Sequence, residues 1–173
     1  MLSILYLIPV LPLAGFLLLG LLGGRLSKRS IAVIGVGSVG SSAALSILIA
    51  ASFLSTPPED RVVVQTLWTW MEIGNFAPSV SLLLDALSLL MVLVITIVGF
   101  LIHLYSAEFM KDEEGYGRFF AWMNLFVAAM LVLVLADGLL LLYLGWEGVG
   151  LCSYLLIGFW YRDPANGRAA RKA

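Results

Sequence analysis

Long apolar runs constrain this chain more than any other feature. A helix that crosses the hydrocarbon core of a bilayer needs about 20 mostly apolar residues, and five stretches of the 173-residue sequence meet that requirement. They cover about residues 2–22, 31–54, 82–105, 119–136 and 139–160. We therefore expect a single all-α membrane domain (1–173) with five transmembrane helices and little mass outside the bilayer.

The composition excludes the main soluble classes of protein. Hydrophobic residues make up 61% of the chain and charged residues 12%, whereas a soluble domain has about 45–50% apolar and about 25% charged residues. Lys and Arg number 10 against 11 Asp and Glu, so no excess of basic charge indicates a nucleic-acid partner. The chain has one cysteine, Cys152, which cannot form an internal disulfide.

The first apolar run has two interpretations, a signal peptide or a retained helix. A signal peptide carries its positive charge before a short apolar core. Here no Lys or Arg precedes the run, and Arg25, Lys28 and Arg29 follow it. We therefore expect a retained helix.

The distribution of basic residues predicts the orientation. One set of loops and the tail hold nine Lys and Arg, whereas the segment between the second and third runs holds Arg61 alone. The nine are Arg25, Lys28, Arg29, Lys111, Arg118, Arg162, Arg168, Arg171 and Lys172. Because basic loops stay on the cytoplasmic side, we expect the N-terminus outside and the C-terminus inside.

The segment between the second and third runs contains two β-prone stretches, residues 62–68 and 73–80. We expect a short outer β-hairpin there, resting on helix ends or on another subunit because an isolated hairpin is marginally stable. Trp68 and Trp70 are expected at the membrane interface, where aromatic residues are enriched.

A glycine pattern in the second run resembles a dinucleotide-binding fingerprint. Gly35, Gly37 and Gly40 form GxGxxG after an apolar stretch, and Asp60 follows 20 residues later. However, Asp60 precedes the next β-prone stretch, and no βαβ pattern continues. Small residues also allow close packing of membrane helices, so we interpret these glycines as a packing surface.

Glu147 is the strongest candidate for chemistry, because it lies inside the fifth run. It follows Leu139 by eight residues, or about 12 Å of helix, close to half of a core about 30 Å thick. An intramembrane carboxyl indicates a proton or ion pathway; the alternative is a hydrogen-bonded structural group. At 100° per residue, one stripe collects Tyr143, Glu147, Gly150, Tyr154, Gly158 and Tyr161. We expect this stripe, and for helix packing Gly150, Tyr154 and Gly158, to face neighbouring helices.

Other candidates have simpler interpretations. His103, near the inner end of the third run, is either a packing residue with satisfied hydrogen bonds or a member of a proton wire. Asp85 and Asp137 precede helices and are typical helix-start carboxylates. The charged cluster at 108–114 indicates a solvated loop, and Cys152 a buried small residue. No metal-ligand constellation is visible.

The most distinctive segment of the sequence is 146–154, WEGVGLCSY, within the longer stretch 130–159, and further characteristic segments occur at 84–88, 99–105 and 114–120. Together these segments resemble the antiporter-like subunit of the proton-pumping NADH:quinone oxidoreductase (respiratory complex I), of the L or chain 5 type. The resemblance covers most of the chain from about residue 65 onward, and the first two runs more loosely.

The resemblance implies a role for two residues. In this family a glutamate on the fifth helix pairs with a lysine on a later, broken helix, and the pair takes part in proton translocation driven by quinone reduction elsewhere. Glu147 matches that glutamate, and His103 matches a family histidine. The three lysines of this chain, Lys28, Lys111 and Lys172, lie outside the expected bilayer spans. The lysine partner of Glu147 is therefore not expected among them.

The resemblance also implies the setting. The family keeps its NADH, flavin, iron–sulfur and quinone sites in other subunits, so no cofactor is expected in this chain. The implied partners are the lipid bilayer and other membrane subunits of a respiratory complex. The implied location is an energy-transducing inner membrane, either the bacterial cell membrane or its mitochondrial equivalent. Family subunits are several times longer, so we expect this chain to be an N-terminal portion. Two alternatives remain, a subunit of a multisubunit cation/proton antiporter and an inactive truncated remnant.

Overall fold

The computed structural model describes residues 2–55, 57, 61–72, 74 and 77–173. Within them, five helices are long and apolar enough to cross a membrane, which matches the number expected. These spans are Leu2–Arg25, Lys28–Leu54, Ala86–Phe109, Tyr116–Leu135 and Leu139–Ile157. The elements in order are η1 (Leu2–Ile4), α1 (Leu7–Leu22), η2 (Gly23–Arg25), α2 (Lys28–Leu54), β1 (Val63–Thr69), β2 (Ser79–Leu84), α3 (Ala86–Phe109), α4 (Tyr116–Leu135), α5 (Leu139–Ile157) and α6 (Pro164–Lys172).

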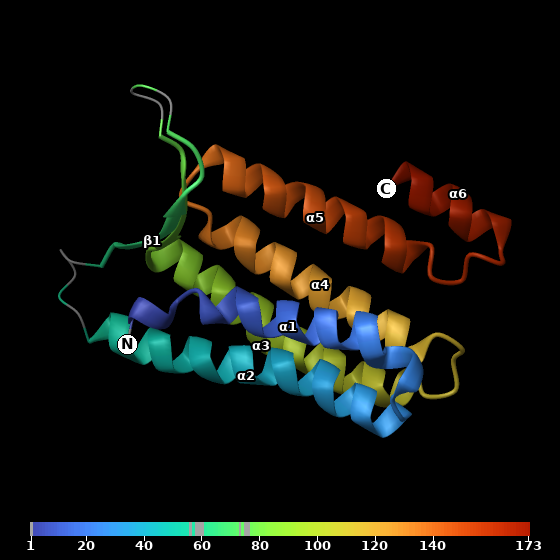
Figure 1. Cartoon of the computed structure of the whole chain (residues 1–173). Coiled ribbons are helices and arrows are strands. Elements are labelled where there is room, and N and C mark those ends of the chain that lie inside the picture. The colour runs from blue at the N-terminus through green and yellow to red at the C-terminus, as the bar shows by residue number, and fades with distance from the viewer. Residues whose placement is uncertain (1, 56, 58–60, 73, 75–76) are drawn as a thin grey trace.

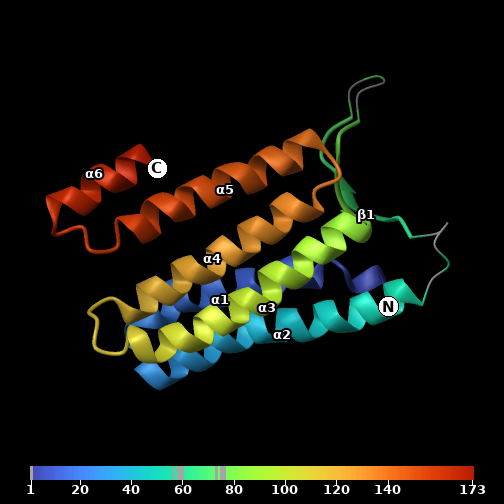
Figure 2. The ribbon, with the colours of Figure 1, turned by 180° about the vertical axis from the view of Figure 1, so that it is seen from behind.

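The helices form a four-helix body with a fifth helix laid on one side. In the body, α4 contacts α1, α2 and α3, while α2 contacts α1 and α3. Helix α5 packs mainly on α4, and α6 turns back beside α5 (Figures 1 and 2). Helix α4 therefore lies between α5 and the rest of the body.

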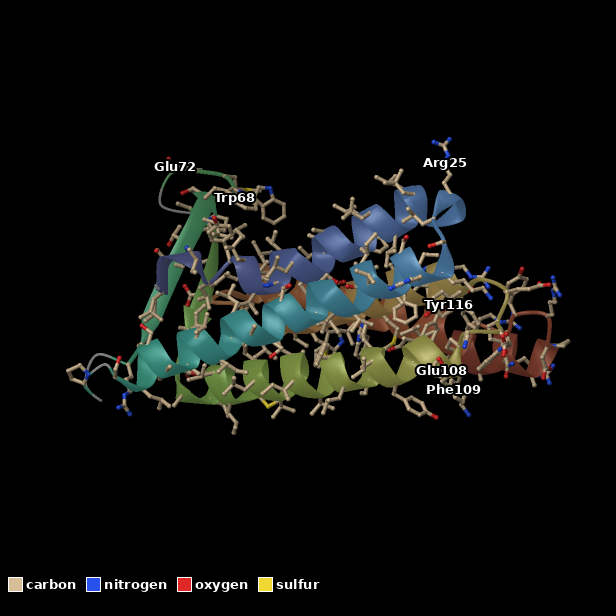
Figure 3. All side chains as sticks on the ribbon, turned by 90° about the horizontal axis from the view of Figure 1, so that it is seen from below. Arg25, Trp68, Glu72, Glu108, Phe109 and Tyr116 are labelled. Carbon is tan, nitrogen blue, oxygen red and sulfur yellow. The ribbon has the colours of Figure 1, made fainter. Side chains whose placement is uncertain are left out.

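Two clusters of buried side chains form the core. One lies toward the hairpin end and includes Leu84 and Leu135, and the other lies toward the opposite end around Tyr116 and Phe120. Figure 3 shows these ends, with Trp68 at the first and Tyr116 at the second. The clusters draw on α1 to α4 at both ends, so the body is held together along its whole length.

Buried polar groups inside the body find partners there. Pro12 lies inside α1 and has no N–H to bond the carbonyl of Ile8 four residues earlier. The Ser42 hydroxyl of α2 donates to that carbonyl oxygen at 2.8 Å. The Ser38 hydroxyl donates to the amide oxygen of Asn124 at 2.5 Å and so links α2 to α4. These bonds satisfy polar groups that would be costly to leave unpaired in hydrocarbon.

The hairpin consists of two antiparallel strands, with Val63 opposite Leu84, and it rests on helix ends. The Asp137 N–H, between α4 and α5, donates to the Ser81 carbonyl at 3.0 Å. At the start of α1, the Tyr6 N–H donates to the Gln65 side chain at 3.1 Å. These contacts supply the support that a two-stranded hairpin needs.

The boundary between the hairpin and the third helix differs from the expectation. Residues 82–84 belong to β2 instead of the helix, which begins at Ala86 and extends to Phe109. The physical reason is a capping box. The Asp85 carboxylate accepts from the Ser88 N–H at 2.7 Å, and the Ser88 hydroxyl bonds the Asp85 N–H at 2.8 Å. Of the second expected β-stretch, 73–80, the last two residues, Ser79 and Val80, begin β2, and residues 73, 75 and 76 lie outside the described residues.

Other helix ends shift by a few residues. Helix α2 begins at Lys28 because the Ser27 side chain caps it, accepting from the Ser30 N–H. Helix α4 covers Tyr116–Leu135 in place of 119–136, and α5 ends at Ile157 instead of 160. The basic tail, for which no element was expected, forms α6, and the Asp163 side chain caps this helix.

Candidate functional site

Glu147 lies near the middle of α5, on the side of that helix turned away from α4. Its side chain is exposed, as are those of Tyr143 and Tyr154 on the same stripe. The Tyr143 hydroxyl, one turn earlier, interacts with the Glu147 carboxylate. A charged side chain at the centre of a membrane helix costs about 2.5–3.5 kcal/mol on the insertion scale. Such groups almost always face protein or a water-filled cavity. We therefore expect other protein, or a water-filled cavity, to lie against this face of α5.

The opposite face of α5 packs on α4 and is built from small and apolar residues. Leu141, Gly145 and Cys152 are buried there. A Cβ atom on Gly145 would lie 2.6 Å from the backbone nitrogen of Leu133, closer than real Cβ atoms approach. The glycine therefore lets the two helix backbones come close together, as small residues do in membrane helix pairs.

The stripe expected to pack on neighbouring helices points out of the helix bundle of this chain. A Cβ on Gly150 would meet none of the described atoms within 4 Å. On Gly158 it would lie 3.2 Å from the Ala170 Cβ of α6. Packing by Gly150 and Tyr154 thus stays a prediction about protein outside this stretch. The interface with α4 was missed, although the spacing of Gly145 and Cys152 on one face could have indicated it.

His103 is fully buried in α3 and faces α4. Its Nδ1 atom lies 2.7 Å from the Gly99 carbonyl oxygen, and its ring contacts the Phe120 ring edge-on at 6.0 Å between centroids. Among the described residues, its Nε2 atom is buried and has no hydrogen-bond partner. The described residues therefore supply a hydrogen-bond partner for one ring nitrogen of His103, and the choice between a packing residue and a member of a proton wire stays a prediction.

Glu147 and His103 do not form one site within this chain. Helix α4 lies between α3 and α5 (Figure 2). His103 lines a groove formed by α3, α4 and the Leu156 end of α5, and Glu147 is not among the lining residues. His103 is therefore buried between α3 and α4, whereas Glu147 lies on the exposed face of α5.

The remaining candidates have structural roles. Asp85 caps α3, as expected. Asp137 does not cap α5, because the N-cap position belongs to Gly138 and no side chain bonds there. Cys152 is buried, and the described residues contain no group of His, Cys, Asp and Glu that could hold a metal ion. Gly35 of the nucleotide-like pattern lies in α2 and packs against Phe120, which supports the packing interpretation.

The charged residues near the α3–α4 connection pair with one another at the end opposite the hairpin. Glu108 bonds Lys111 and Glu114 bonds Arg162, each at 3.1 Å. The Arg118 guanidinium lies 5.1 Å from the Trp122 ring centroid and 5.1 Å from that of Tyr161. Exposed pairs of this kind contribute little stability each. These contacts join the segment after α5 to the α3–α4 connection and the start of α4, and none of them places a cation near Glu147.

Two family sequence models match the chain. Residues 70–120 match a family described as "NADH-Ubiquinone oxidoreductase (complex I), chain 5 N-terminus". Residues 136–173 match a family described as "NADH:quinone oxidoreductase/Mrp antiporter, TM". These matches fall on the segments that carry the resemblance seen in the sequence.

Curated relatives match almost the whole chain. The chain is 57% identical over 164 residues to NADH-quinone oxidoreductase subunit L of Escherichia coli, which covers 95% of this chain and 26% of that protein. For subunit L of Mycobacterium tuberculosis H37Rv the identity is 42% over 168 residues, covering 97% and 26%. The chain thus spans about a quarter of the length of these relatives. The resemblance to the L or chain 5 type is confirmed.

A solved structure supports the fold. It is described as the membrane-bound sulfane sulfur reductase, an archaeal respiratory membrane complex, and it matches with a TM-score of 0.68 at 20% identity. The match covers 87% of this chain and 22% of that one. Together with the five apolar helices, the comparisons identify a multi-pass protein of the bacterial inner membrane or its mitochondrial equivalent.

Proposed function

Since the chain belongs to the L-subunit (chain 5) family of NADH-quinone oxidoreductase and corresponds to its N-terminal portion, we propose that it forms part of a proton-translocating membrane subunit in which Glu147 carries protons near the middle of the membrane. The redox chemistry belongs to other subunits, which hold the NADH, flavin, iron–sulfur and quinone sites. In this proposal the chain supplies a body of membrane helices and one ionisable group, Glu147, on α5 beside that body.

The observation that carries the proposal is the exposed position of Glu147 at mid-helix, on the face of α5 turned away from α4. Hydrocarbon surroundings favour the neutral form of a carboxyl, and a nearby cation favours the charged form. A group that is switched between these surroundings takes up a proton in one and releases it in the other. Glu147 has the geometry for such switching, because its face of α5 is open to a partner.

The partner must come from outside this stretch. Lys28 bonds the Lys111 carbonyl, Lys111 pairs with Glu108, and Lys172 ends α6. All three lysines therefore lie at helix ends or in loops, away from the middle of α5. We propose that a lysine of a later helix in the complete subunit faces Glu147, as the family resemblance implies. Taken alone, the stretch is not expected to move protons.

His103 is a second candidate for the pathway. Histidine titrates near neutral pH, and among the described residues the buried Nε2 atom of His103 has no hydrogen-bond partner. Because His103 and Glu147 lie on different sides of α4, any connection between them runs through groups of other helices.

The test uses a chimera in which residues 1–173 replace the matching stretch of E. coli subunit L. Glu147→Gln keeps the shape of the side chain but cannot ionise. We expect a lower ratio of protons moved per NADH oxidised in sealed vesicles, with normal assembly on a native gel. Glu147→Asp keeps the charge and is expected to be milder. Glu72→Gln, in the connection after β1, is the matched control. An unchanged ratio for Glu147→Gln in an assembled complex would leave only a structural role.

The orientation is part of the proposal. The basic residues gather at the end of the body opposite the hairpin, where Figure 3 places Arg25, and we propose that this end faces the cytoplasm. A topology reporter fused after Ala173 is expected to read cytoplasmic, and one inserted beside Pro57 to read external. The opposite readings, with the fusion after Ala173 external and the insertion beside Pro57 cytoplasmic, would reject the orientation but would still agree with five spanning helices.

A second candidate function is a subunit of a cation/proton antiporter, in which transport is not coupled to oxidation. The observation that favours it is the match of residues 136–173 to a family that includes Mrp antiporters. Cation-driven proton exchange in vesicles without NADH, lost in Glu147→Gln, would support this alternative. Transport that requires NADH oxidation would support the first.

A further inference from the structure

We propose that Tyr143 is the positioning residue of Glu147, and that its hydroxyl stays hydrogen-bonded to the carboxyl group in both protonation states of that group. Tyr143 lies on α5 one helical turn before Glu147, and both side chains are exposed. The inference rests on the proposed function in one respect, because it gives Tyr143 a part in the proton step at Glu147. It names the group within this chain that holds the carboxyl in place.

The geometry of α5 brings the two side chains together. Residues four apart are neighbours on a helix surface, with about 5–6 Å between their Cβ atoms. Each Cα–Cβ bond is tilted toward the helix N-terminus, so the Glu147 side chain is directed toward the turn that carries Tyr143. The Tyr143 hydroxyl interacts with the Glu147 carboxylate there. Because α5 begins beside the hairpin (Figure 1), Tyr143 lies on the hairpin side of Glu147.

Two other hydroxyl groups of α5 are less suited to this role. The Ser153 hydroxyl donates to the Val149 carbonyl of its own helix at 2.9 Å. Tyr154 shares the exposed stripe, but it lies seven residues after Glu147, or about 10 Å along the helix axis. Tyr143 is only four residues away, or about 6 Å. Tyr143 is therefore the tyrosine of α5 that is placed to hold the Glu147 carboxyl.

A phenol hydroxyl suits a carboxyl group that gains and loses a proton. An ionised carboxylate only accepts hydrogen bonds, whereas a protonated carboxyl keeps an acceptor and gains an O–H donor. The Tyr143 hydroxyl both donates and accepts, so it can bond Glu147 in either state. A nearby cation, in contrast, strongly favours the charged form. Tyr143 can therefore fix the position of the carboxyl while its charge is left to the lysine proposed on a later helix.

The contact is testable by infrared spectroscopy of the complete chimeric subunit. The difference between spectra recorded with and without Glu147→Gln, in the same background, isolates the bands of this carboxyl. A hydrogen bond weakens the C=O bond, so we expect Tyr143→Phe to shift the C=O band of the protonated group to higher frequency. The carboxylate bands of the ionised group are expected to shift as well.

Tyr154→Phe is the matched control for the infrared measurement, because Tyr154 lies on the same stripe and is 48% exposed, against 62% for Tyr143. We expect it to leave both sets of bands in place. Bands that do not move in Tyr143→Phe, or that move in only one protonation state, would overturn the inference. An equal shift in Tyr154→Phe would also overturn it.

The role in proton transfer is tested by the ratio of protons moved per NADH oxidised in sealed vesicles. We expect Tyr143→Phe to lower the ratio by a smaller fraction than Glu147→Gln does. Tyr105→Phe on α3, where the side chain is 66% exposed, is expected to leave the ratio unchanged. Because Tyr143 acts through Glu147, Tyr143→Phe should cause no further loss when it is added to Glu147→Gln.

The outcomes separate this inference from the proposed function. An unchanged ratio in Tyr143→Phe, or a further loss in the double variant, would overturn the positioning role, because a merely structural effect adds to that of Glu147→Gln. An unchanged ratio in Glu147→Gln itself would reject the proposed function. The infrared bands would then still decide whether Tyr143 holds the carboxyl.

Discussion

The four-helix body and α5 differ in the surroundings of their polar side chains, which are hydrogen-bonded inside the body and exposed at Glu147 on α5. Inside the body, Ser42 bonds a carbonyl of α1, Asn124 bonds Ser38, and the Thr96 hydroxyl bonds the Val92 carbonyl at 2.8 Å. On α5, Glu147 is exposed on a helix whose span is only 11% buried, against 44% for α4. Helix α4 is thus enclosed by other helices of this stretch, whereas α5 is covered on one side only.

The difference shows where an ionisable group can be placed without disturbing the fold. Lipid tails are as apolar as a leucine side chain, so the hydrophobic effect does not drive the association of helices within the membrane. Close backbone contact at Gly145 therefore holds α5 on α4, and the face with Glu147 is free to meet a partner. His103 is the exception inside the body, because its Nε2 atom has no hydrogen-bond partner among the described residues.

The largest expected effect tests the attachment of α5. Gly145→Leu places a side chain where a Cβ alone would lie 2.6 Å from the α4 backbone. Overpacking of a tight interface costs about 1–3 kcal/mol and occasionally more, and we expect the upper end because the obstacle is backbone. The measurement is the amount of assembled chimeric subunit on a native gel, together with its midpoint of thermal unfolding.

Two controls accompany this change. Leu140 is 47% exposed, so Leu140→Ala is expected to be nearly silent. A Cβ on Gly150 would have none of the described atoms within 4 Å, so the effect of Gly150→Leu in the complete subunit reports whether other helices cover the stripe. A large effect there would support the sequence-based packing prediction. A tolerated Gly145→Leu would show that α5 is not held through this contact.

The next effect tests the polar link inside the body. Asn124→Leu removes the bond to Ser38 and leaves the Gly35 carbonyl with fewer donors, since Asn124 also donates to it at 3.3 Å. Each of these two hydrogen bonds contributes about 0.5–1.5 kcal/mol, so we expect a loss of about 2 kcal/mol. The measurement is the free energy of unfolding in micelles. A loss below about 0.5 kcal/mol would mean that the hydrogen bonds of Asn124 do not stabilise the body.

The sequence predicted the number of helices because apolar length reports directly on membrane crossing. It placed the start of the third helix wrongly, because Leu82, Leu83 and Leu84 suit a buried strand as well as a helix. The capping box of Asp85 and Ser88 decides between them. The sequence pattern Asp-x-x-Ser marks that start, but apolar counting gives it no weight.

The faces of α5 could be predicted only in part. Small and polar residues at 143–161 indicated a face for protein contact. Gly145, Gly148 and Cys152 form a second small-residue face, about 155° away at 100° per residue. Periodicity identifies both faces but does not assign either to a neighbour. The assignment of Gly145 to α4 needs coordinates, and the partner of Glu147 lies outside this stretch. The unpaired Nε2 of His103 was likewise invisible, because it depends on the side chains of other helices.

A smaller effect tests the junction between hairpin and body. Asp85→Ala removes the N-cap of α3 and is expected to cost about 1 kcal/mol of unfolding free energy. Hydrogen bonds from Ser88, foremost its backbone N–H, hold the pKa of Asp85 below its ordinary value of 3.8. A lowered pKa stabilises the fold above the ordinary value, and this contribution is lost as pH falls through the lowered one. The difference between wild type and Asp85→Ala in a denaturant titration should therefore shrink below about pH 4. A pH-independent difference would contradict the ionised cap.

The smallest effect tests the bond that compensates for a proline. Ser42→Ala removes the donor to the Ile8 carbonyl, and hydrogen bonds between membrane helices contribute about 0.6 kcal/mol on average. In Pro12→Ala, residue 12 regains an N–H that can bond the same carbonyl. Ser42→Ala should then cost less in that background than in the wild type. The measurement is a double-mutant cycle on the free energy of unfolding, in which neighbouring residues that share a partner show coupling. Additive effects of the two substitutions would mean that Ser42 does not serve the carbonyl left by Pro12. Coupling would show that a side chain of the body satisfies the carbonyl that Pro12 leaves without its helical donor. The partner proposed for Glu147, in contrast, lies outside this stretch.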